Sequence, residues 1–86
     1  MSYPSREVRE FAQQYLMGEF APRGEKDKKL IALGLIASVV PEHAFEAWLD
    51  APHPDLGGRT PRSVIDSGHA DAVITMVANA IRGIPS

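Results

Sequence analysis

Residues 30–40 read LIALGLIASVV, a stretch without a charged side chain and with apolar residues on nearly every side of a helix. A helix that is apolar all round is buried in the core of a protein or in a membrane. Because this stretch is far shorter than the roughly 20 residues that span a bilayer, we expect it to be the central, most buried helix of a soluble domain. Asp27 is predicted to cap its start, Pro41 to end it, and Gly34 to let another helix pack closely.

A second helix is expected N-terminal to this stretch, over residues 5–17. Its apolar residues recur at the i, i+3, i+4, i+7 spacing of one helix face, and they are Val8, Phe11, Ala12, Tyr15 and Leu16. Such a face packs either on the chain's own bundle or on a second copy of the chain. The candidate residues for self-association into a homo-oligomer are Val8, Phe11, Tyr15 and Leu16. Residues 18–27 combine two glycines, a proline and several charges, which is typical of a linker.

Three further helices are expected C-terminal to the central one, over residues 42–50, 61–66 and 69–82. No run of strand length alternates between apolar and polar residues. The expected fold class is therefore all-α, a small bundle of about five helices around the central apolar helix. We divide the chain into an N-terminal helix with a charged linker, residues 1–27, and a helical domain, residues 28–86.

Several residues near the predicted helix ends are expected to have structural roles. Trp48 and Leu56 are predicted to lie in the core and to hold the loop over residues 51–60. Thr60 followed by Pro61 is typical of an N-cap and a first helical residue, so these two are expected to begin the helix over 61–66.

The 86 residues contain no cysteine and carry a formal net charge of −2. The lack of cysteine excludes a disulfide framework, a thiolate zinc site and a cysteine nucleophile. Residues 1–29 hold 6 Lys/Arg against 5 Asp/Glu, whereas residues 30–86 hold 3 against 6. Because this acidic part repels phosphate and anionic lipid, we expect no membrane partner. The start MSYPSREVRE has no apolar segment of the kind that directs secretion, so we expect a cytoplasmic location.

The sequence contains no catalytic motif of the GxSxG, P-loop or HExxH kind. The segment GGRT at residues 57–60 lacks the preceding strand and the lysine of a phosphate-binding loop. His43, Glu46 and Asp50 can share a helix face, but no second cluster of ligands completes a metal site. We therefore predict a protein that is not an enzyme, with no catalytic residue, no metal ligand and no cofactor.

Residues 35–49 have the helix, tight turn, helix rhythm of a DNA-binding helix-turn-helix. The second of these helices would read the bases, yet it carries Glu42, Glu46 and Asp50 and no Arg, Lys, Asn or Gln. Three carboxylates repel the phosphates that line a groove, and the residues that recognise bases are missing. We do not expect this chain alone to bind DNA.

Residues 28–83 resemble the C-terminal toxin-binding domain of the MbcA/ParS/Xre antitoxins. The family pattern is a long apolar helix, an alanine-rich helix ending in Trp-Leu, the motif Pro-x-x-x-Leu-x-Gly-x-Thr-Pro, a short helix, a glycine, and a closing helix that ends in glycine. The residues that carry this pattern here are Trp48, Leu49, Pro52, Leu56, Gly58, Thr60, Pro61, Gly68 and Gly83. The spacing from Gly68 through Val73 to Gly83 is similar to that of the mycobacterial MbcA type.

The resemblance implies a non-enzymatic antitoxin that binds and inhibits a RES-domain toxin, an enzyme that degrades NAD. In such pairs the C-terminal helix and tail of the antitoxin lie over the toxin's NAD entrance, which places Arg82, Gly83 and Ile84 near the partner's active site. Arg59 and Arg62 either contact the toxin or neutralise a neighbouring carboxylate.

Family members usually carry a complete N-terminal helix-turn-helix domain, whereas only about 27 residues with one predicted helix precede the resemblance here. Two alternative functions therefore stay open. One is a stand-alone accessory protein, encoded by a phage or another mobile element, that binds a host regulatory protein. The other is a repressor-type domain that assists DNA binding. The expected setting is the cytoplasm of a bacterium or of a phage-infected bacterium.

Overall fold

The computed structural model describes residues 3–83, which form five α-helices and two short 3-10 helices. In chain order these are α1 (Arg6–Leu16), α2 (Glu25–Val39), η1 (Glu42–Ala44), α3 (Phe45–Leu49), η2 (Pro54–Leu56), α4 (Pro61–Asp66) and α5 (Ala70–Arg82). No strand occurs among these residues. The predicted all-α class is confirmed.

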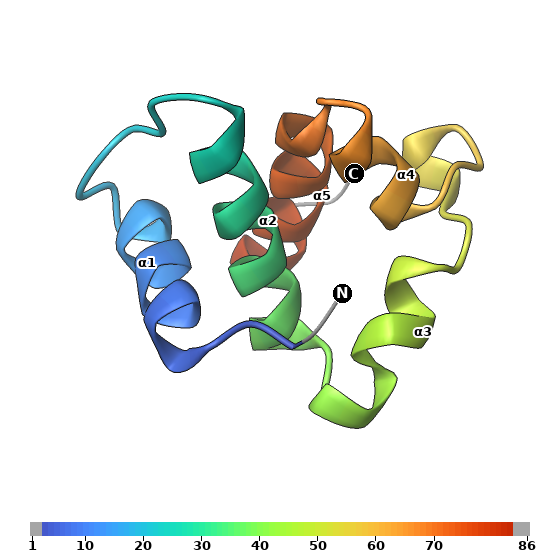
Figure 1. Cartoon of the computed structure of the whole chain (residues 1–86), viewed down its shortest axis with the longest axis horizontal. Coiled ribbons are helices and arrows are strands. Elements are labelled where there is room, and N and C mark those ends of the chain that lie inside the picture. The colour runs from blue at the N-terminus through green and yellow to red at the C-terminus, as the bar shows by residue number, and fades with distance from the viewer. Residues whose placement is uncertain (1–2, 84–86) are drawn as a thin grey trace.

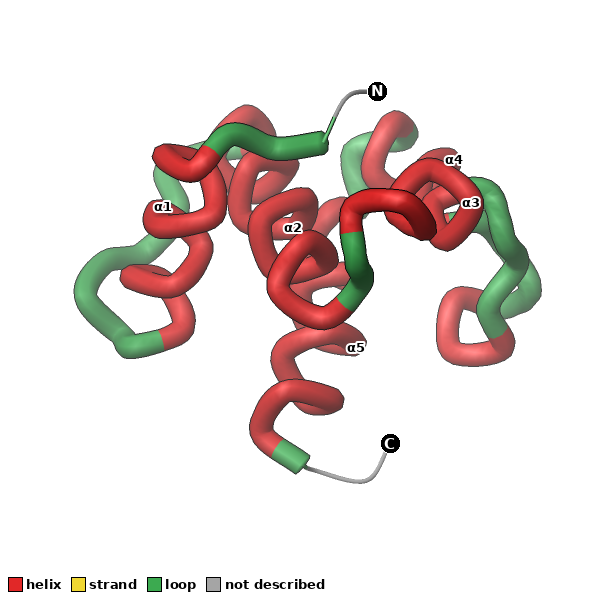
Figure 2. The backbone as a smooth tube through the Cα atoms, turned by 90° about the horizontal axis from the view of Figure 1, so that it is seen from below, coloured by secondary structure: helices red, strands yellow, loops and turns green. Residues whose placement is uncertain are grey.

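The apolar helix α2 is the centre of the bundle, as predicted. Both views place it between α1 on one side and the α3–α4 pair on the other, with α5 packed alongside it (Figure 1 and Figure 2). Its fully or almost fully buried residues are Ile31, Ala32, Gly34, Leu35, Ile36 and Ala37. The other helices add the apolar residues Phe45, Leu49, Val64, Ile65, Val73, Ile74 and Val77 to the same core.

The start of α2 differs from the expected one. The helix begins at Glu25, with Gly24 as its N-cap, so Asp27 lies inside the first turn instead of capping the helix from outside. The Asp27 carboxylate accepts a hydrogen bond of 3.1 Å from the Arg23 N–H and so ties the linker to the helix. Acidic residues in a first turn interact favourably with the helix dipole, which allows the charged segment after Gly24 to be helical.

Helix α1 packs directly against α2 through Gly34. A Cβ atom on Gly34 would lie 2.6 Å from the Ala12 Cβ and 2.8 Å from the Val8 carbonyl oxygen, so the two backbones approach as closely as glycine permits. Ala12 is fully buried at this crossing. The close packing that Gly34 predicts is confirmed.

The apolar face of α1 is covered in part by the chain itself. The Phe11 ring stacks on Phe20 of the following segment with centroids 4.6 Å apart, and Tyr15 meets the same ring edge-on. The four residues proposed for self-association, Val8, Phe11, Tyr15 and Leu16, are all half-buried. Of the two expected packing modes, the structure shows the one within the chain, and association into a homo-oligomer stays a prediction.

Tyr3 joins the start of the described chain to the far end of α2. Its hydroxyl donates a hydrogen bond of 3.2 Å to the Ala37 carbonyl oxygen, and its ring packs edge-to-face on Phe45 at 5.2 Å. The Arg9 guanidinium lies 5.5 Å from the centroid of the same ring, at a cation–π distance. The chain entering α1 is therefore fixed to both α2 and α3.

The predicted single helix over 42–50 is wrong in detail. The segment begins as the 3-10 turn η1 over Glu42–Ala44 and becomes α-helical only at Phe45. Pro41 is extended, with ψ 156°, and precedes the turn. Tight 3-10 turns of this kind are frequent at the N-termini of α-helices.

The loop over residues 51–60 is more ordered than expected, because it contains the 3-10 turn η2. The His53 N–H donates to the Arg59 carbonyl oxygen, and the Gly58 N–H donates to the His53 carbonyl oxygen, so the loop closes on itself. Gly57 and Gly58 have positive φ angles of 66° and 81°, which only glycine adopts readily. As predicted, Leu56 inserts from this loop into the core and is 8% exposed.

The ends of the last two helices follow the predicted signals. Thr60 is the N-cap of α4, and its hydroxyl accepts a hydrogen bond of 3.2 Å from the Ser63 N–H. Pro61 is the first helical residue and is buried. Gly83 ends α5 in the left-handed conformation.

No single helix among residues 3–83 is long and apolar enough to cross a membrane. The pair Glu25–Val39 and Glu42–Leu49 reaches that length and composition together, but the two helices are bent by 118° at their junction.

Candidate functional site

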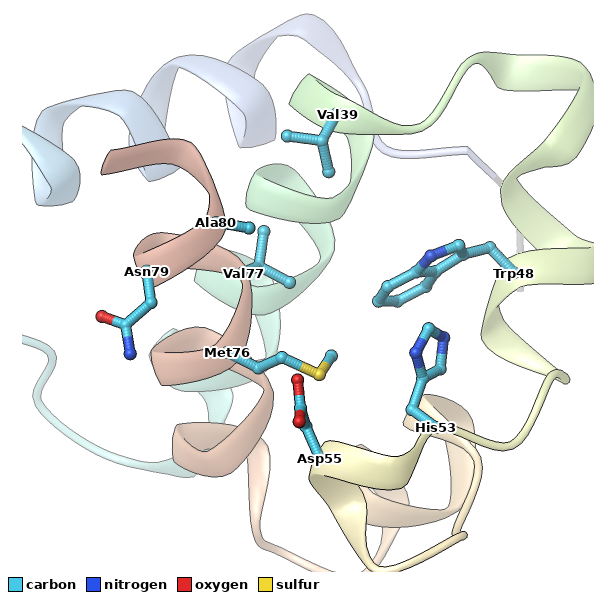
Figure 3. Close-up of a pocket in the computed structure, with 8 residues that line it drawn as sticks. All are labelled: Val39, Trp48, His53, Asp55, Met76, Val77, Asn79 and Ala80. Carbon is cyan, nitrogen blue, oxygen red and sulfur yellow. The ribbon is translucent and has the colours of Figure 1, made fainter. Parts of the chain in front are cut away.

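A pocket of about 270 Å³ opens on the face where α5 meets α3 and the loop that contains η2 (Figure 3). It is formed by four separate parts of the chain: the end of α2, α3, the loop over 51–60 and α5. The residues that line it are Val39, Trp48, His53, Asp55, Met76, Val77, Asn79 and Ala80. The fold thus brings together side chains that lie up to about 40 positions apart in the sequence.

The walls of this pocket are mainly apolar and reach the surface. Trp48 and Met76 are half-buried, and Val39 at the rim is 49% exposed. Among the described residues, Val39 and Met17 are the large hydrophobic residues that stay well exposed, and Met17 is not part of the pocket. A recessed apolar surface with a few polar groups is the usual form of a binding site.

Trp48 therefore has a different environment from the predicted one. It packs against the core from outside, whereas one side of its indole faces the pocket (Figure 3). The His53 ring lies against the indole with centroids 4.6 Å apart and an angle of 49° between the planes. Trp48 holds the loop over 51–60 through this ring contact, as expected, but it is not a fully buried core residue.

Three polar side chains complete the pocket. The Asp55 carboxylate lies beside the Met76 thioether and faces inward (Figure 3), and it makes no ion pair or hydrogen bond within residues 3–83. His53 Nε2 is a buried nitrogen without a hydrogen-bond partner in that part of the chain. Asn79 contributes an amide at the rim. A buried polar atom without a partner is costly, so this pocket is well suited to a ligand that supplies one.

Arg62 lies outside the pocket and joins α4 to α3. Its guanidinium donates hydrogen bonds to both oxygens of Asp50, at 2.7 and 3.2 Å, and to Glu46 at 3.3 Å. The hydrogen bonds from Arg62 to Asp50 hold the pKa of the Asp50 carboxyl below its usual range. Of the two roles predicted for Arg62, the structure shows the pairing with neighbouring carboxylates. Glu46 and Asp50 are thereby engaged by a cation, and no group of three or more potential metal ligands occurs within residues 3–83.

We expect Arg62→Gln to lower the melting temperature near neutral pH and to have a smaller effect in acid. The pKa of Asp50 is lower in the folded chain, so its pairing stabilises the fold above the carboxyl's unfolded pKa of about 4 and is lost as the pH falls below that value. Melting curves of both proteins between pH 2 and pH 7 would show the two melting temperatures converging in acid.

The matched control is Arg6→Gln, which breaks an i,i+4 ion pair of 3.0 Å with Glu10 on the exposed side of α1. Such an exposed pair contributes little, and this variant should melt almost as the original chain does. If the Arg62→Gln difference stayed constant from pH 7 to pH 2, Arg62 would stabilise the fold through its aliphatic stem instead of its ion pairs.

The other residues predicted to contact a partner lie on different parts of the surface. Arg59 is exposed in the loop, and Arg82 is exposed at the end of α5, where its guanidinium donates a weak hydrogen bond of 3.4 Å to the Leu16 carbonyl oxygen. Gly83 follows at the helix end, and Ile84 lies outside the described residues. None of the three arginines lines the pocket, so the structure does not bring the predicted contact residues into one site.

Of the eight pocket residues the sequence analysis names only Trp48, and it places that residue in the core. The seven others were not predicted to line a site, namely Val39, His53, Asp55, Met76, Val77, Asn79 and Ala80. Val39 ends a helix whose other apolar residues are buried, and no local pattern distinguishes it from them. One usable signal was the segment HPD at residues 53–55 directly after the Trp-Leu helix, because two polar side chains there flank a proline that shapes the loop.

All eight pocket residues lie within a segment that can be compared with known families. The family model of the antitoxin Xre/MbcA/ParS C-terminal toxin-binding domain matches residues 36–83. The chain belongs to this family. No curated protein and no solved structure matches it significantly.

Membership gives the chain an antitoxin-like role in which it binds a protein partner, a toxin. Domains of this family are generally non-enzymatic. The segment matched to the toxin-binding domain begins within α2 at Ile36 and ends at Gly83, so it includes the pocket, the Arg62 ion pairs and the exposed end of α5. Each of these features is thus part of the toxin-binding domain itself and not of the N-terminal helix.

Proposed function

We propose that this chain binds a RES-domain toxin, an enzyme that degrades NAD, and inhibits it by covering the toxin's NAD entrance with its own C-terminal end. The observation that carries the proposal is the match of residues 36–83 to the antitoxin toxin-binding domain. In this arrangement Arg82, Gly83 and Ile84 lie near the partner's active site, and Arg59 contacts the toxin from the loop. The antitoxin blocks the substrate physically and performs no chemistry.

The geometry of α5 supports such a role for its end. The helix is anchored on the core by Val73, Ile74 and Val77, which are 5% exposed or less. Arg82 and Gly83 at its last turn are exposed, so a partner can reach them without disturbing the packing. A rigid helix that presents an exposed cationic end needs little ordering on binding, which favours affinity.

We expect removal of residues 84–86 to weaken the inhibition of NAD consumption by a cognate RES-domain toxin, without changing the helix content of the antitoxin. The truncation leaves every described helix in place and removes the last three residues of the end proposed to cover the entrance. The measurement is the rate of NAD loss by the toxin at saturating concentrations of each antitoxin, together with circular dichroism of each protein.

Lys26→Gln is a suitable control, because it removes an exposed cation on α2 outside the matched segment. This variant should inhibit as the full chain does. Full inhibition by the truncated protein would show that another surface blocks the toxin. Failure of the full chain to inhibit RES-domain toxins would instead favour a host regulatory protein as the partner.

A further inference from the structure

We infer that the pocket between Trp48 and Asp55 receives an arginine side chain of the toxin. The identity of the partner as a toxin rests on the proposed function, whereas the chemistry of the side chain follows from the pocket itself. Three properties of the pocket carry the inference: its charge, the shape and nature of its walls, and the hydrogen-bonding groups that have no partner.

The charge of the pocket favours a cation. Asp55 is the acidic residue that lines it, and this carboxylate has no ion-pair partner within residues 3–83. No lysine or arginine is among the residues that line the pocket, and Arg62 is already paired with Asp50. Residues 30–86 as a whole hold 3 basic against 6 acidic residues, so the surrounding field also attracts a basic partner.

The walls of the pocket favour a long side chain with a flat cationic end. The indole of Trp48 offers a broad aromatic face, on which a planar guanidinium stacks better than an ammonium group does. Met76, Val39 and Val77 provide an apolar surface for the methylene groups of the same side chain. The thioether of Met76 is flexible and adapts to an inserted group.

The hydrogen-bonding groups distinguish arginine from an apolar or aromatic side chain. An apolar occupant would cover the Asp55 carboxylate and leave it and His53 Nε2 without partners, which costs free energy. A guanidinium carries five N–H donors and no acceptor. It can therefore donate hydrogen bonds to the carboxylate of Asp55, to the amide oxygen of Asn79 and to His53 Nε2 in the tautomer that carries its hydrogen on Nδ1.

Trp48 makes this inference measurable on the free protein, because it is the only tryptophan of the chain. The probe is N-acetyl-arginine amide, and the neutral isostere N-acetyl-citrulline amide is the matched ligand control. We expect the arginine derivative to change the Trp48 fluorescence saturably, with a dissociation constant in about the millimolar range expected for one side chain. The citrulline derivative should have a much smaller effect.

Asp55→Asn is the decisive variant, since it removes the charge of an exposed residue whose side chain makes no hydrogen bond or ion pair within residues 3–83. It should bind the arginine derivative about fivefold or more weakly. Asp66→Asn, which removes the charge of an exposed residue outside the pocket, should leave the binding unchanged. Equal responses to both ligands, no saturable response, or an Asp55→Asn protein that binds as the original does would each overturn the inference.

The toxin provides an independent measurement that separates this inference from the proposed function. We expect Asp55→Asn to weaken binding of a RES-domain toxin by about tenfold, whereas Asp66→Asn should not. If the arginine derivative binds through Asp55 but no RES-domain toxin is inhibited, the pocket inference stands and the proposed partner is wrong. If the toxin is inhibited equally by the Asp55→Asn protein, the proposed function stands and the pocket inference is wrong.

Discussion

Replacing Phe45 by alanine is expected to lower the free energy of unfolding by about 3–5 kcal/mol, which is the usual loss for a fully buried phenylalanine. Phe45 is 1% exposed and is among the largest buried side chains of the core. Its removal also takes away the edge-to-face contact with Tyr3. Because a domain of this size is stable by only about 5–15 kcal/mol, the variant should melt at a much lower temperature, as circular dichroism would show.

Trp48→Ala is the informative comparison for this variant. Trp48 is the larger side chain, yet it is half-buried and faces an open pocket, so its removal leaves no closed cavity. We therefore expect it to lower the stability less than Phe45→Ala does, while it removes the aromatic wall of the pocket. An equal loss of stability from both variants would mean that Trp48 belongs to the closed core after all. The stability of the Phe45→Leu variant should lie between that of the original chain and that of Phe45→Ala.

Gly34→Ala is expected to destabilise the fold by about 1–3 kcal/mol, the usual cost of adding volume to a tightly packed core. The sign of this change in stability is informative, because alanine in a helix is otherwise about 1 kcal/mol more favourable than glycine. The added methyl group would lie 2.6 Å from the Ala12 Cβ and 2.8 Å from the Val8 carbonyl oxygen, so α1 must move away from α2. Urea unfolding of the variant and the original chain measures the difference.

Two further variants test whether the contact between the helices is the cause. Gly24→Ser adds a side chain at the N-cap of α2, where nothing lies within 4 Å of the new Cβ and serine is a favoured residue. It should be neutral or stabilising. Ala12→Gly combined with Gly34→Ala removes the nearer of the two clashes, so the double variant should lose less stability than the two single variants together. If the double variant instead lost as much stability as the two single variants added together, contact with α1 would not be what restricts the side chain at position 34.

The parts of the fold that follow from local chemistry could be predicted from the sequence. An uncharged segment that is apolar on nearly all sides has to be buried, so the central position of α2 followed from residues 30–40 alone. Thr60 followed by Pro61, and Gly83 after an apolar helix, indicate helix ends through backbone geometry that does not depend on tertiary packing. These predictions agree with the structure.

The features that were missed depend on charge and on distant contacts. The first turns of α2 are helical although their residues are mostly charged, and apolar periodicity cannot detect such a segment. The Arg62 side chain pairs with Asp50 only because α3 and α4 meet at an angle that neither sequence segment specifies. The pocket needs four parts of the chain at once, so the exposed Val39 and the half-buried Trp48 could not be distinguished from core residues by pattern alone.

The position of Gly34 near the middle of α2 also limits how this protein can be divided. The segment shared with the family begins at Ile36, two positions beyond that glycine, so the family boundary passes through the most buried helix of the molecule. A gene fragment cut there would lose Ile31 and Leu35 together with the whole of α1, and the surfaces that these residues cover on the remaining helices would be exposed to water. The segment matched by the family model and the segment needed to cover the core are thus different parts of this chain. Domain swaps between relatives should therefore exchange α1 and α2 together with the toxin-binding segment.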